Sequence, residues 1–251
     1  MSQVLAIVSQ KGGVGKTSLV QNLGAELAVA GQRVLLVDFD PQANLTEGWG
    51  IDPAADVATV YHAMLSMVTV QAARITLRER LDLLPASLDL AGADPHFAGE
   101  LDRYYKLSQT LQPLLAEYDF VLIDSPPSLG YFVNSALMAA DAVLIPLQVH
   151  AYAYKALDQL LAIVGKAAQI NRGLAVQGIV LTMYDRRNNL TTSVEEAARE
   201  RFGDLIYETV IPVNVRIAEA PLDGQPVGEM AADSAGAAAY AALAKEILTN
   251  G

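Results

Sequence analysis

Short apolar runs alternate along the chain with longer stretches that are compatible with helices. The apolar runs predict buried strands at Val4–Val8, Val34–Val37, Leu81–Leu84, Phe120–Ile123, Val143–Pro146, Gly178–Thr182 and Thr209–Ile211. The stretches between them predict helices at Ser18–Ala30, Tyr104–Glu117, 152–170, 191–202 and 234–248. Strands that are apolar almost throughout are typical of a parallel sheet covered on both faces. We therefore expect an α/β fold with a mostly parallel sheet and helices on both faces.

No internal repeat, low-complexity linker or domain boundary interrupts this alternation, so residues 1–251 are interpreted as a single domain. A chain of 251 residues is long enough for one large α/β domain. The alanine-rich segment Ala235–Ala244 is expected to be a helix packed against this domain. Pro221–Gly228 is expected to be a surface loop because it contains proline and glycine.

Composition narrows the classes of function. The absence of cysteine excludes disulfides, thiolate catalysis, zinc–thiolate sites and iron–sulfur clusters. No secretion signal or membrane-spanning run is recognised, so we expect a cytoplasmic protein. The net charge of −11 argues against a generic nucleic-acid binder. Since the acidic excess is larger in residues 1–150, an anionic partner other than nucleotide is expected to meet a focused patch in the C-terminal part.

A glycine-rich loop lies between the first predicted strand and the first predicted helix. It reads Lys11-Gly12-Gly13-Val14-Gly15-Lys16-Thr17-Ser18, with Gln10 where the common phosphate-binding pattern has glycine. Glycines let backbone N–H groups turn toward phosphate oxygens, and the helix dipole adds to the attraction. Lys16 is expected to reach the β- and γ-phosphates, and the Thr17 hydroxyl to bind Mg²⁺. These residues predict a nucleotide-binding P-loop.

Two aspartates follow predicted strands near this loop. Asp124 ends the fourth predicted strand, where it can hold Mg²⁺ through water. Asp40 lies after the second strand, where it can face the γ-phosphate and orient the attacking water. It is counted with Thr17 and Asp124 as a candidate metal ligand. Asp38 either holds the metal indirectly or braces the loop. The pattern predicts an ATPase that uses ATP and Mg²⁺.

Three motifs, Lys11–Thr17, Leu36–Asn44 and Asp124–Pro127, resemble the deviant Walker motifs of ParA/Soj chromosome and plasmid partitioning ATPases. The segments Leu181–Asp185 and Val210–Pro221 extend the resemblance, which covers essentially residues 3–248. The first three motifs are shared with related ATPases, whereas the Ile-Pro-x-Asn-Val-Arg-x-x-Glu-Ala-Pro block is specific to the partitioning branch.

The resemblance implies a catalytic set and an assembly. ATP would hold two chains in a sandwich homodimer, in which Lys11 reaches the partner's phosphates and acts in catalysis with Lys16 and Asp40. Pro212 and Asn214 would pack on adenine and read it. ATP hydrolysis to ADP and phosphate would be stimulated by a ParB-like partner.

The resemblance also implies DNA binding. Arg187 and Arg216 match arginines that family members use to contact the DNA backbone without sequence preference, so the ATP-bound dimer would associate with the nucleoid. Release on hydrolysis would segregate a plasmid, a chromosome or another cargo. Val213 stands where the family often has arginine, which removes one positive charge near Arg216.

Two other functions are compatible with a P-loop of this kind. A MinD-like membrane-cycling ATPase needs a basic, amphipathic C-terminal helix, whereas residues 242–251 hold one lysine and no aromatic residue. A metallocluster carrier is excluded by the absence of cysteine, and a biotin-pathway ligase needs a carboxylate-substrate site that the sequence does not reveal. We expect no membrane partner.

Overall fold

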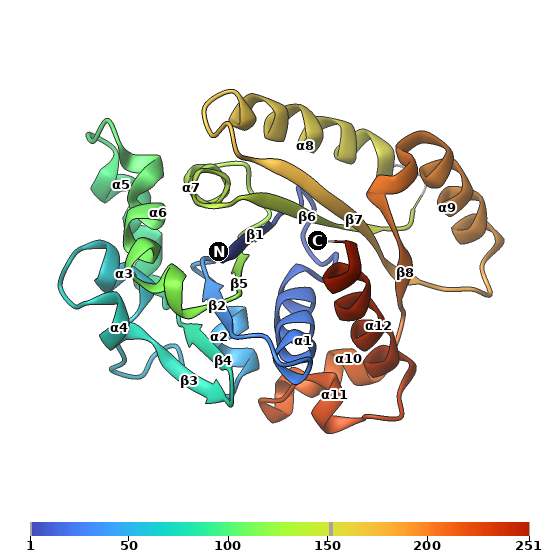
Figure 1. Ribbon diagram of the computed structural model, residues 1–251, viewed down its shortest axis with the longest axis horizontal. Helices are drawn as coiled ribbons and strands as arrows, with labels where there is room; N and C mark the ends of the chain where they lie inside the picture. The colour runs from blue at the N-terminus through green and yellow to red at the C-terminus, as the bar shows by residue number, and fades with distance from the viewer. Residues whose placement is uncertain (1, 151–152, 251) are drawn as a thin grey trace.

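An eight-stranded sheet runs through the computed structural model, which describes residues 2–150 and 153–250 (Figure 1). Its strands are β1 (Gln3–Ile7), β2 (Val34–Asp38), β3 (Ile75–Arg78), β4 (Leu81–Leu84), β5 (Phe120–Asp124), β6 (Ala142–Gln148), β7 (Ala175–Tyr184) and β8 (Ile206–Pro212). They lie in the order β3-β4-β2-β5-β1-β6-β7-β8, and every adjacent pair is parallel except β3 with β4. The mostly parallel sheet expected from the sequence is confirmed.

Helices follow most of the strands. The α-helices are α1 (Lys16–Val29), α2 (Asn44–Gly48), α3 (Val60–Met64), α4 (Val70–Ala73), α5 (Ala93–Phe97), α6 (Lys106–Leu111), α7 (Tyr131–Ala139), α8 (Ala153–Ala168), α9 (Asn189–Phe202), α10 (Val215–Glu219), α11 (Val227–Met230) and α12 (Ala235–Asn250). The 3-10 helices are η1 (Leu88–Gly92), η2 (Arg103–Tyr105), η3 (Gln112–Glu117), η4 (Gly203–Leu205) and η5 (Ala220–Asp223).

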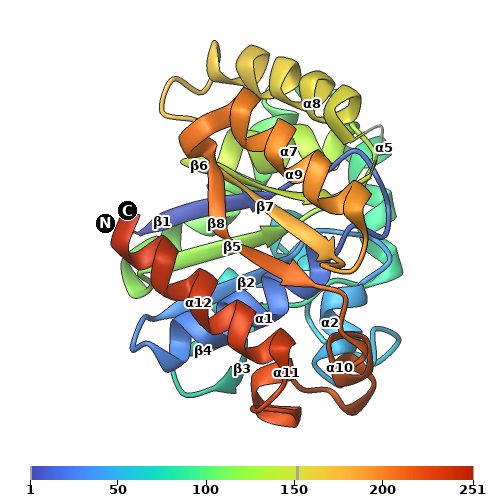
Figure 2. The ribbon, with the colours of Figure 1, turned by 90° about the vertical axis from the view of Figure 1, so that its right-hand side faces the viewer.

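The sheet separates two apolar cores. Along β1, Val4 and Ala6 belong to one core, whereas Leu5 and Ile7 belong to the other, as the two-residue period of a strand requires. Helices α7 and α8 cover the first face, and α1 and α12 lie side by side on the second (Figures 1 and 2). Both faces are therefore covered, which accounts for strands that are apolar almost throughout.

The alanine-rich C-terminal segment is a packed helix, as predicted. Tyr240, Leu243 and Ile247 of α12 are buried in the core that α12 shares with α1. Its small residues allow α12 to approach α1 and β8 closely, so the last helix of the chain contacts the element that follows the P-loop.

Two local predictions were wrong, and one strand was not predicted. The helix expected over Tyr104–Glu117 is divided into η2, α6 and η3, with Pro113 in the first turn of η3, because proline has no backbone N–H to continue the α-helix. Pro221–Gly228 is largely helical instead of a loop, since η5 and α11 occupy most of it. Strand β3 was missed because its residues alternate between half-buried and exposed at the sheet edge.

Gly178 is required by the packing of β7 against Tyr207 of β8. A Cβ atom at this position would lie on the Tyr207 ring and 3.2 Å from the Leu205 carbonyl oxygen. We therefore predict that Gly178→Ala lowers the free energy of unfolding by about 1–3 kcal/mol, the usual cost of overpacking a core. Gly173→Ala is the matched control, because its Cβ would meet only Asn171 Oδ1, at 3.7 Å. Equal urea midpoints for the two variants would contradict this account.

Candidate nucleotide-binding site

The P-loop connects the end of β1 to the start of α1. Gly13 and Gly15 have φ values of 72° and 87°, in the left-handed region that favours glycine. Gly15 is the N-cap residue of α1, and no side chain caps the amides of the first turn. These amides therefore point from the positive end of a helix toward whatever occupies the loop, as an anion site requires.

A cavity of about 750 Å³ lies beside the loop. It is lined by residues of the P-loop, of the segment after β2, and of the C-terminal part: Gly12, Gly13, Gly15, Lys16, Thr17, Ser18, Asp40, Gln42, Asn44, Glu47, Gly48, Gly50, Pro127, Met183, Pro221 and Leu222. The structure thus brings Lys16, Thr17 and Asp40 to one cavity, as the sequence predicted.

Lys16 is a buried cation. Its side chain is largely covered, and burial lowers the pKa of its ammonium group, although the negative charges of Asp124 and Asp40 oppose that shift. No ion pair joins Lys16 to a residue in the described part of the chain. A buried charge without a partner is costly, so the site favours an anionic ligand at this position.

Asp124 and Thr17 form a pair at the carboxyl end of β5. The Thr17 hydroxyl donates to Asp124 Oδ2 at 2.6 Å, and Asp124 Oδ1 is buried without a hydrogen-bond partner. Burial, reinforced by the nearby charge of Asp38, raises the pKa of Asp124 to about 7. A hydroxyl and a carboxylate with an unused oxygen are donors that suit Mg²⁺, which usually takes its remaining ligands from phosphate and water.

No larger cluster of metal ligands exists in the described residues. Groups of three or more histidine, cysteine, aspartate or glutamate side chains that could hold a metal are absent from 2–150 and 153–250. The donor set at Thr17 and Asp124 therefore fits a metal ion that arrives with a phosphate ligand better than one held by the protein alone.

Asp38 braces the loop that carries Asp40. Its Oδ2 accepts hydrogen bonds from the Thr46 N–H at 2.8 Å and the Thr46 hydroxyl at 2.7 Å, and its Oδ1 accepts from the Asp40 N–H at 3.2 Å. Burial raises the pKa of Asp38 to about 6. Asp40 itself lines the cavity and accepts from the Gln42 N–H at 2.9 Å. Of the two roles open to Asp38, the geometry favours the structural one.

Lys11 points away from the phosphate cavity of its own chain. Its exposed ammonium group donates to Gln148 Oε1 at 2.8 Å, at the end of β6. Lys11 lines a neighbouring cavity of about 460 Å³ between the P-loop, β6 and α8. The two lysines of the motif therefore line different cavities of the same chain.

Pro212 and Asn214 lie outside the P-loop cavity. Pro212 ends β8 and lines a separate hollow, and Asn214 caps α10 by accepting from the Arg216 N–H at 2.8 Å. Instead, Met183, Pro221 and Leu222 line the P-loop cavity from the C-terminal side. Met183 has a φ of 51°, which the sequence did not reveal, while Pro221 belongs to the partitioning block that could have indicated it.

Arg187 and Arg216 do not line the P-loop cavity, and they lie on neighbouring segments. The Val213 N–H donates to the Tyr184 carbonyl oxygen at 3.1 Å, which joins the ends of β7 and β8. Arg187 pairs with Asp185, and Arg216 pairs with Glu219. The fold therefore brings the two segments together, as their proposed common role requires.

The raised pKa of Asp124 gives a test of this site. Since burial disfavours its charged form, Asp124 destabilises the folded state increasingly as pH rises from about 4 to about 7, and by a constant amount above that. We predict that Asp124→Asn raises the unfolding free energy of the nucleotide-free protein by at most about 4 kcal/mol at pH 8, because one pKa unit is worth about 1.4 kcal/mol. The gain should fall below half of that at pH 5. Urea unfolding of both proteins measures it, and a difference independent of pH would contradict the assignment.

Comparison with known proteins identifies the family. Residues 2–176 match the family described as an AAA domain. The chain is 44% identical over 253 residues to sporulation initiation inhibitor protein Soj of Bacillus subtilis (strain 168), with 100% of both chains covered. It is 43% identical over 251 residues to chromosome partitioning protein ParA of Caulobacter vibrioides (strain NA1000 / CB15N), with 98% of this chain and 94% of that protein covered.

Solved structures share the fold. Cobyrinic acid a,c-diamide synthase from Mycobacterium smegmatis, with bound ADP and magnesium, has a TM-score of 0.86 and 36% identity, over 99% of this chain and 94% of that chain. The cell division ATPase MinD of Pyrococcus furiosus has a TM-score of 0.83 and 29% identity, over 100% of both chains. With full-length relatives above 40% identity, the chain belongs to the ParA/Soj family of chromosome-partitioning ATPases.

Proposed function

We propose that this protein hydrolyses ATP and that its ATP-bound dimer binds DNA without sequence preference until a ParB-like partner stimulates hydrolysis. The main support is the P-loop cavity, which is lined by the buried Lys16, by the uncapped start of α1 and by Thr17, whose hydroxyl donates to the Asp124 carboxylate. A triphosphate with a divalent cation complements that arrangement in charge and in hydrogen bonding.

ATP and Mg²⁺ fit the residues of this cavity. The amides of Gly12–Ser18 and the Lys16 ammonium would hold the phosphates, and Thr17 with Asp124 would hold Mg²⁺. A Mycobacterium smegmatis neighbour was crystallised with ADP and magnesium, which supports the same ligands here. When bound, the metal ion supplies positive charge against the phosphate oxygens.

Asp40 would orient the attacking water. It lines the cavity, and two hydrogen bonds fix its loop: Asp40 N–H to Asp38 Oδ1 and Gln42 N–H to Asp40 Oδ1. A carboxylate held in this way can accept a hydrogen bond from water near the γ-phosphate. Pro212 and Asn214 remain proposed adenine contacts, which would require the nucleotide base to reach beyond the P-loop cavity.

The position of Lys11 supports a sandwich dimer. Because Lys16 already serves the phosphate cavity of its own chain and Lys11 points away from it, Lys11 is free to reach the phosphates of a second chain. Breaking its single exposed hydrogen bond to Gln148 costs little, since such bonds contribute about 1 kcal/mol net. An additional positive charge facing the γ-phosphate would make the dimer depend on ATP rather than ADP.

Arg187 and Arg216 would bind the DNA backbone. Both lie on the surface formed by the ends of β7 and β8, and a two-fold dimer axis would present this surface twice. This places the expected basic patch in the C-terminal part of an acidic protein. Attachment to DNA would place the protein on the nucleoid, and its cargo would follow the ATP cycle.

The MinD-like alternative is less well supported. In the described part of the chain, no helix is long and apolar enough to cross a bilayer. The apolar side of α12, which includes Tyr240, Leu243 and Ile247, already packs in the core with α1. A helix that uses its apolar side in this way has little left to place in a membrane surface.

Lys11→Ala and Lys16→Ala separate the two lysine roles. Lys16→Ala should lose ATP binding, because the buried phosphate charge is no longer compensated. Lys11→Ala should bind ATP within a few-fold of the parent but form no ATP-dependent dimer and no ATP-dependent DNA complex. Calorimetry measures ATP affinity, size-exclusion chromatography with light scattering measures the dimer, and anisotropy of a random-sequence duplex measures DNA binding.

ADP and nucleotide-free samples of the parent are the controls. Dimers of Lys11→Ala equal to those of the parent would remove the sandwich arrangement from the proposal. Failure of the ATP-bound parent dimer to bind DNA would remove DNA from it.

A further inference from the structure

The turn after β7 is fixed next to the end of β8. Tyr184, the last residue of β7, lies opposite Pro212 in the strand register, and its carbonyl oxygen accepts the Val213 N–H at 3.1 Å. Within the turn, the Arg187 N–H donates to Asp185 Oδ1 at 3.0 Å. The backbone that carries residues 185–187 is therefore held from both sides.

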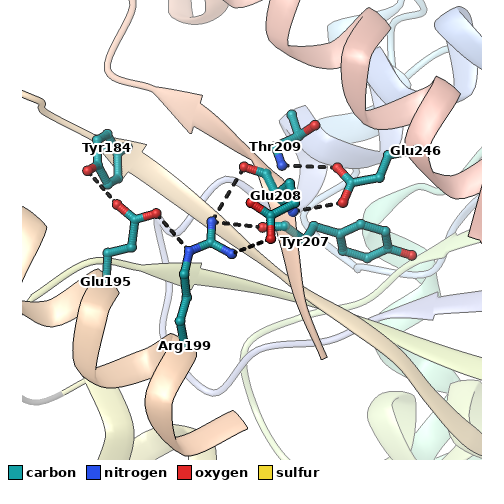
Figure 3. A network of polar contacts seen from close by, with 7 residues as sticks. All are labelled: Tyr184, Glu195, Arg199, Tyr207, Glu208, Thr209 and Glu246. Carbon is teal, nitrogen blue, oxygen red and sulfur yellow. Dashed lines mark hydrogen bonds and ion pairs between the residues drawn. The ribbon is translucent and has the colours of Figure 1, made fainter. Parts of the chain in front are cut away.

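A polar network anchors this turn to α9 (Figure 3). The Tyr184 hydroxyl donates to Glu195 Oε2 at 2.5 Å, and Arg199 Nε donates to Glu195 Oε1 at 2.9 Å. The Arg199 guanidinium continues to the Tyr207 carbonyl oxygen at 3.2 Å. The network links β7, α9 and β8 next to the turn.

Side-chain hydrogen bonds also cover the outer side of β8. Glu246 of α12 accepts the N–H groups of Glu208 and Thr209 at 2.7 and 3.0 Å (Figure 3). β8 is an edge strand, and these contacts give hydrogen-bond acceptors to two of its N–H groups that would otherwise be unpaired. Because these hydrogen bonds hold the elements next to the turn, a side chain on the turn loses only its own rotamer freedom when it binds a phosphate.

The two arginines assigned to DNA are already neutralised by neighbours. Arg187 makes two hydrogen bonds to the Asp185 carboxylate, at 3.0 and 3.1 Å. Arg216 donates to Glu219 at 2.8 Å. A phosphate that binds either arginine must therefore share it with a carboxylate or displace that carboxylate.

Arg186 differs from both. It is exposed and forms no ion pair with any residue among 2–150 and 153–250. It lines, with Arg187, Pro212 and Val213, a shallow hollow of about 780 Å³. Val213, which is 63% exposed, contributes no charge to the hollow, whereas Arg186 brings a positive charge to it from the neighbouring turn.

We propose, on the basis of the proposed function, that Arg186 is the principal phosphate contact of the DNA-binding surface and that Asp185 and Glu219 weaken the contacts of Arg187 and Arg216. An unpaired guanidinium on a fixed turn needs to break no ion pair before it meets a phosphate. The two carboxylates keep the affinity of the surface low, which suits a dimer that must be released.

The test is a salt series of duplex binding by the ATP-bound dimer. Each neutralised phosphate adds about 0.9 to the slope of log affinity against log salt, and a dimer carries two copies of each arginine. Arg186→Ala should therefore reduce the slope by about 2 and lower the affinity about tenfold or more at 0.1 M salt. Arg186→Lys should keep the slope near that of the parent. Asp185→Asn should raise the affinity several-fold, because it releases Arg187 and removes a negative charge.

Arg172→Ala is the matched control. It removes the same net charge from an exposed position before the opposite end of β7 and should leave the slope unchanged. Light scattering with ATP first confirms that every variant is dimeric. If the parent binds DNA and Arg186→Ala behaves like Arg172→Ala, this inference is overturned while the proposed function stands. If the parent dimer fails to bind DNA with ATP, both are overturned.

Discussion

Three carboxylates and one lysine are buried together where β2 and β5 end and the P-loop begins. Asp38, Asp40, Asp124 and Lys16 all have side chains that water barely reaches. The sheet order places β2, β5 and β1 next to each other, so their carboxyl ends converge on this point. Burying so much charge is unfavourable without ligands, which explains the raised pKa values of Asp38 and Asp124. The pocket is therefore suited to bind phosphate and metal, and its buried charges lower the stability of the folded protein when these ligands are not bound.

The surrounding fold keeps this arrangement in place. The Thr182 hydroxyl of β7 donates to the Val14 carbonyl oxygen at 2.9 Å, and the Ser125 hydroxyl donates to the Ile7 carbonyl oxygen at 3.0 Å. The first bond ties the P-loop to the carboxyl end of β7, which Arg186 and Arg187 follow directly. The last helix of the chain packs on the helix that follows the P-loop.

Much of the site could be predicted because its chemistry depends on short local patterns. Lys16, Thr17, Asp40 and Asp124 follow apolar strands of a parallel sheet, and parallel strands bring their carboxyl ends to one edge. Contacts that depend on distant parts of the chain could not be predicted. The bond from Lys11 to Gln148, for example, joins residues 137 positions apart. The helical structure within residues 221–228 was not predicted, because the proline and glycine residues of this segment are typical of turns. Tertiary packing outweighed that preference.

We propose that Asp124, whose Oδ1 has no hydrogen-bond partner, would help Thr17 to hold the Mg²⁺ that accompanies ATP. Calorimetric titration with ATP at pH 8, with Mg²⁺ and with EDTA, tests it most directly in the parent and in Asp124→Asn. The account predicts that Mg²⁺ strengthens ATP binding to the parent and that this gain is largely lost in the variant, while binding in EDTA is similar for both. An equal gain from Mg²⁺ in both proteins would contradict it.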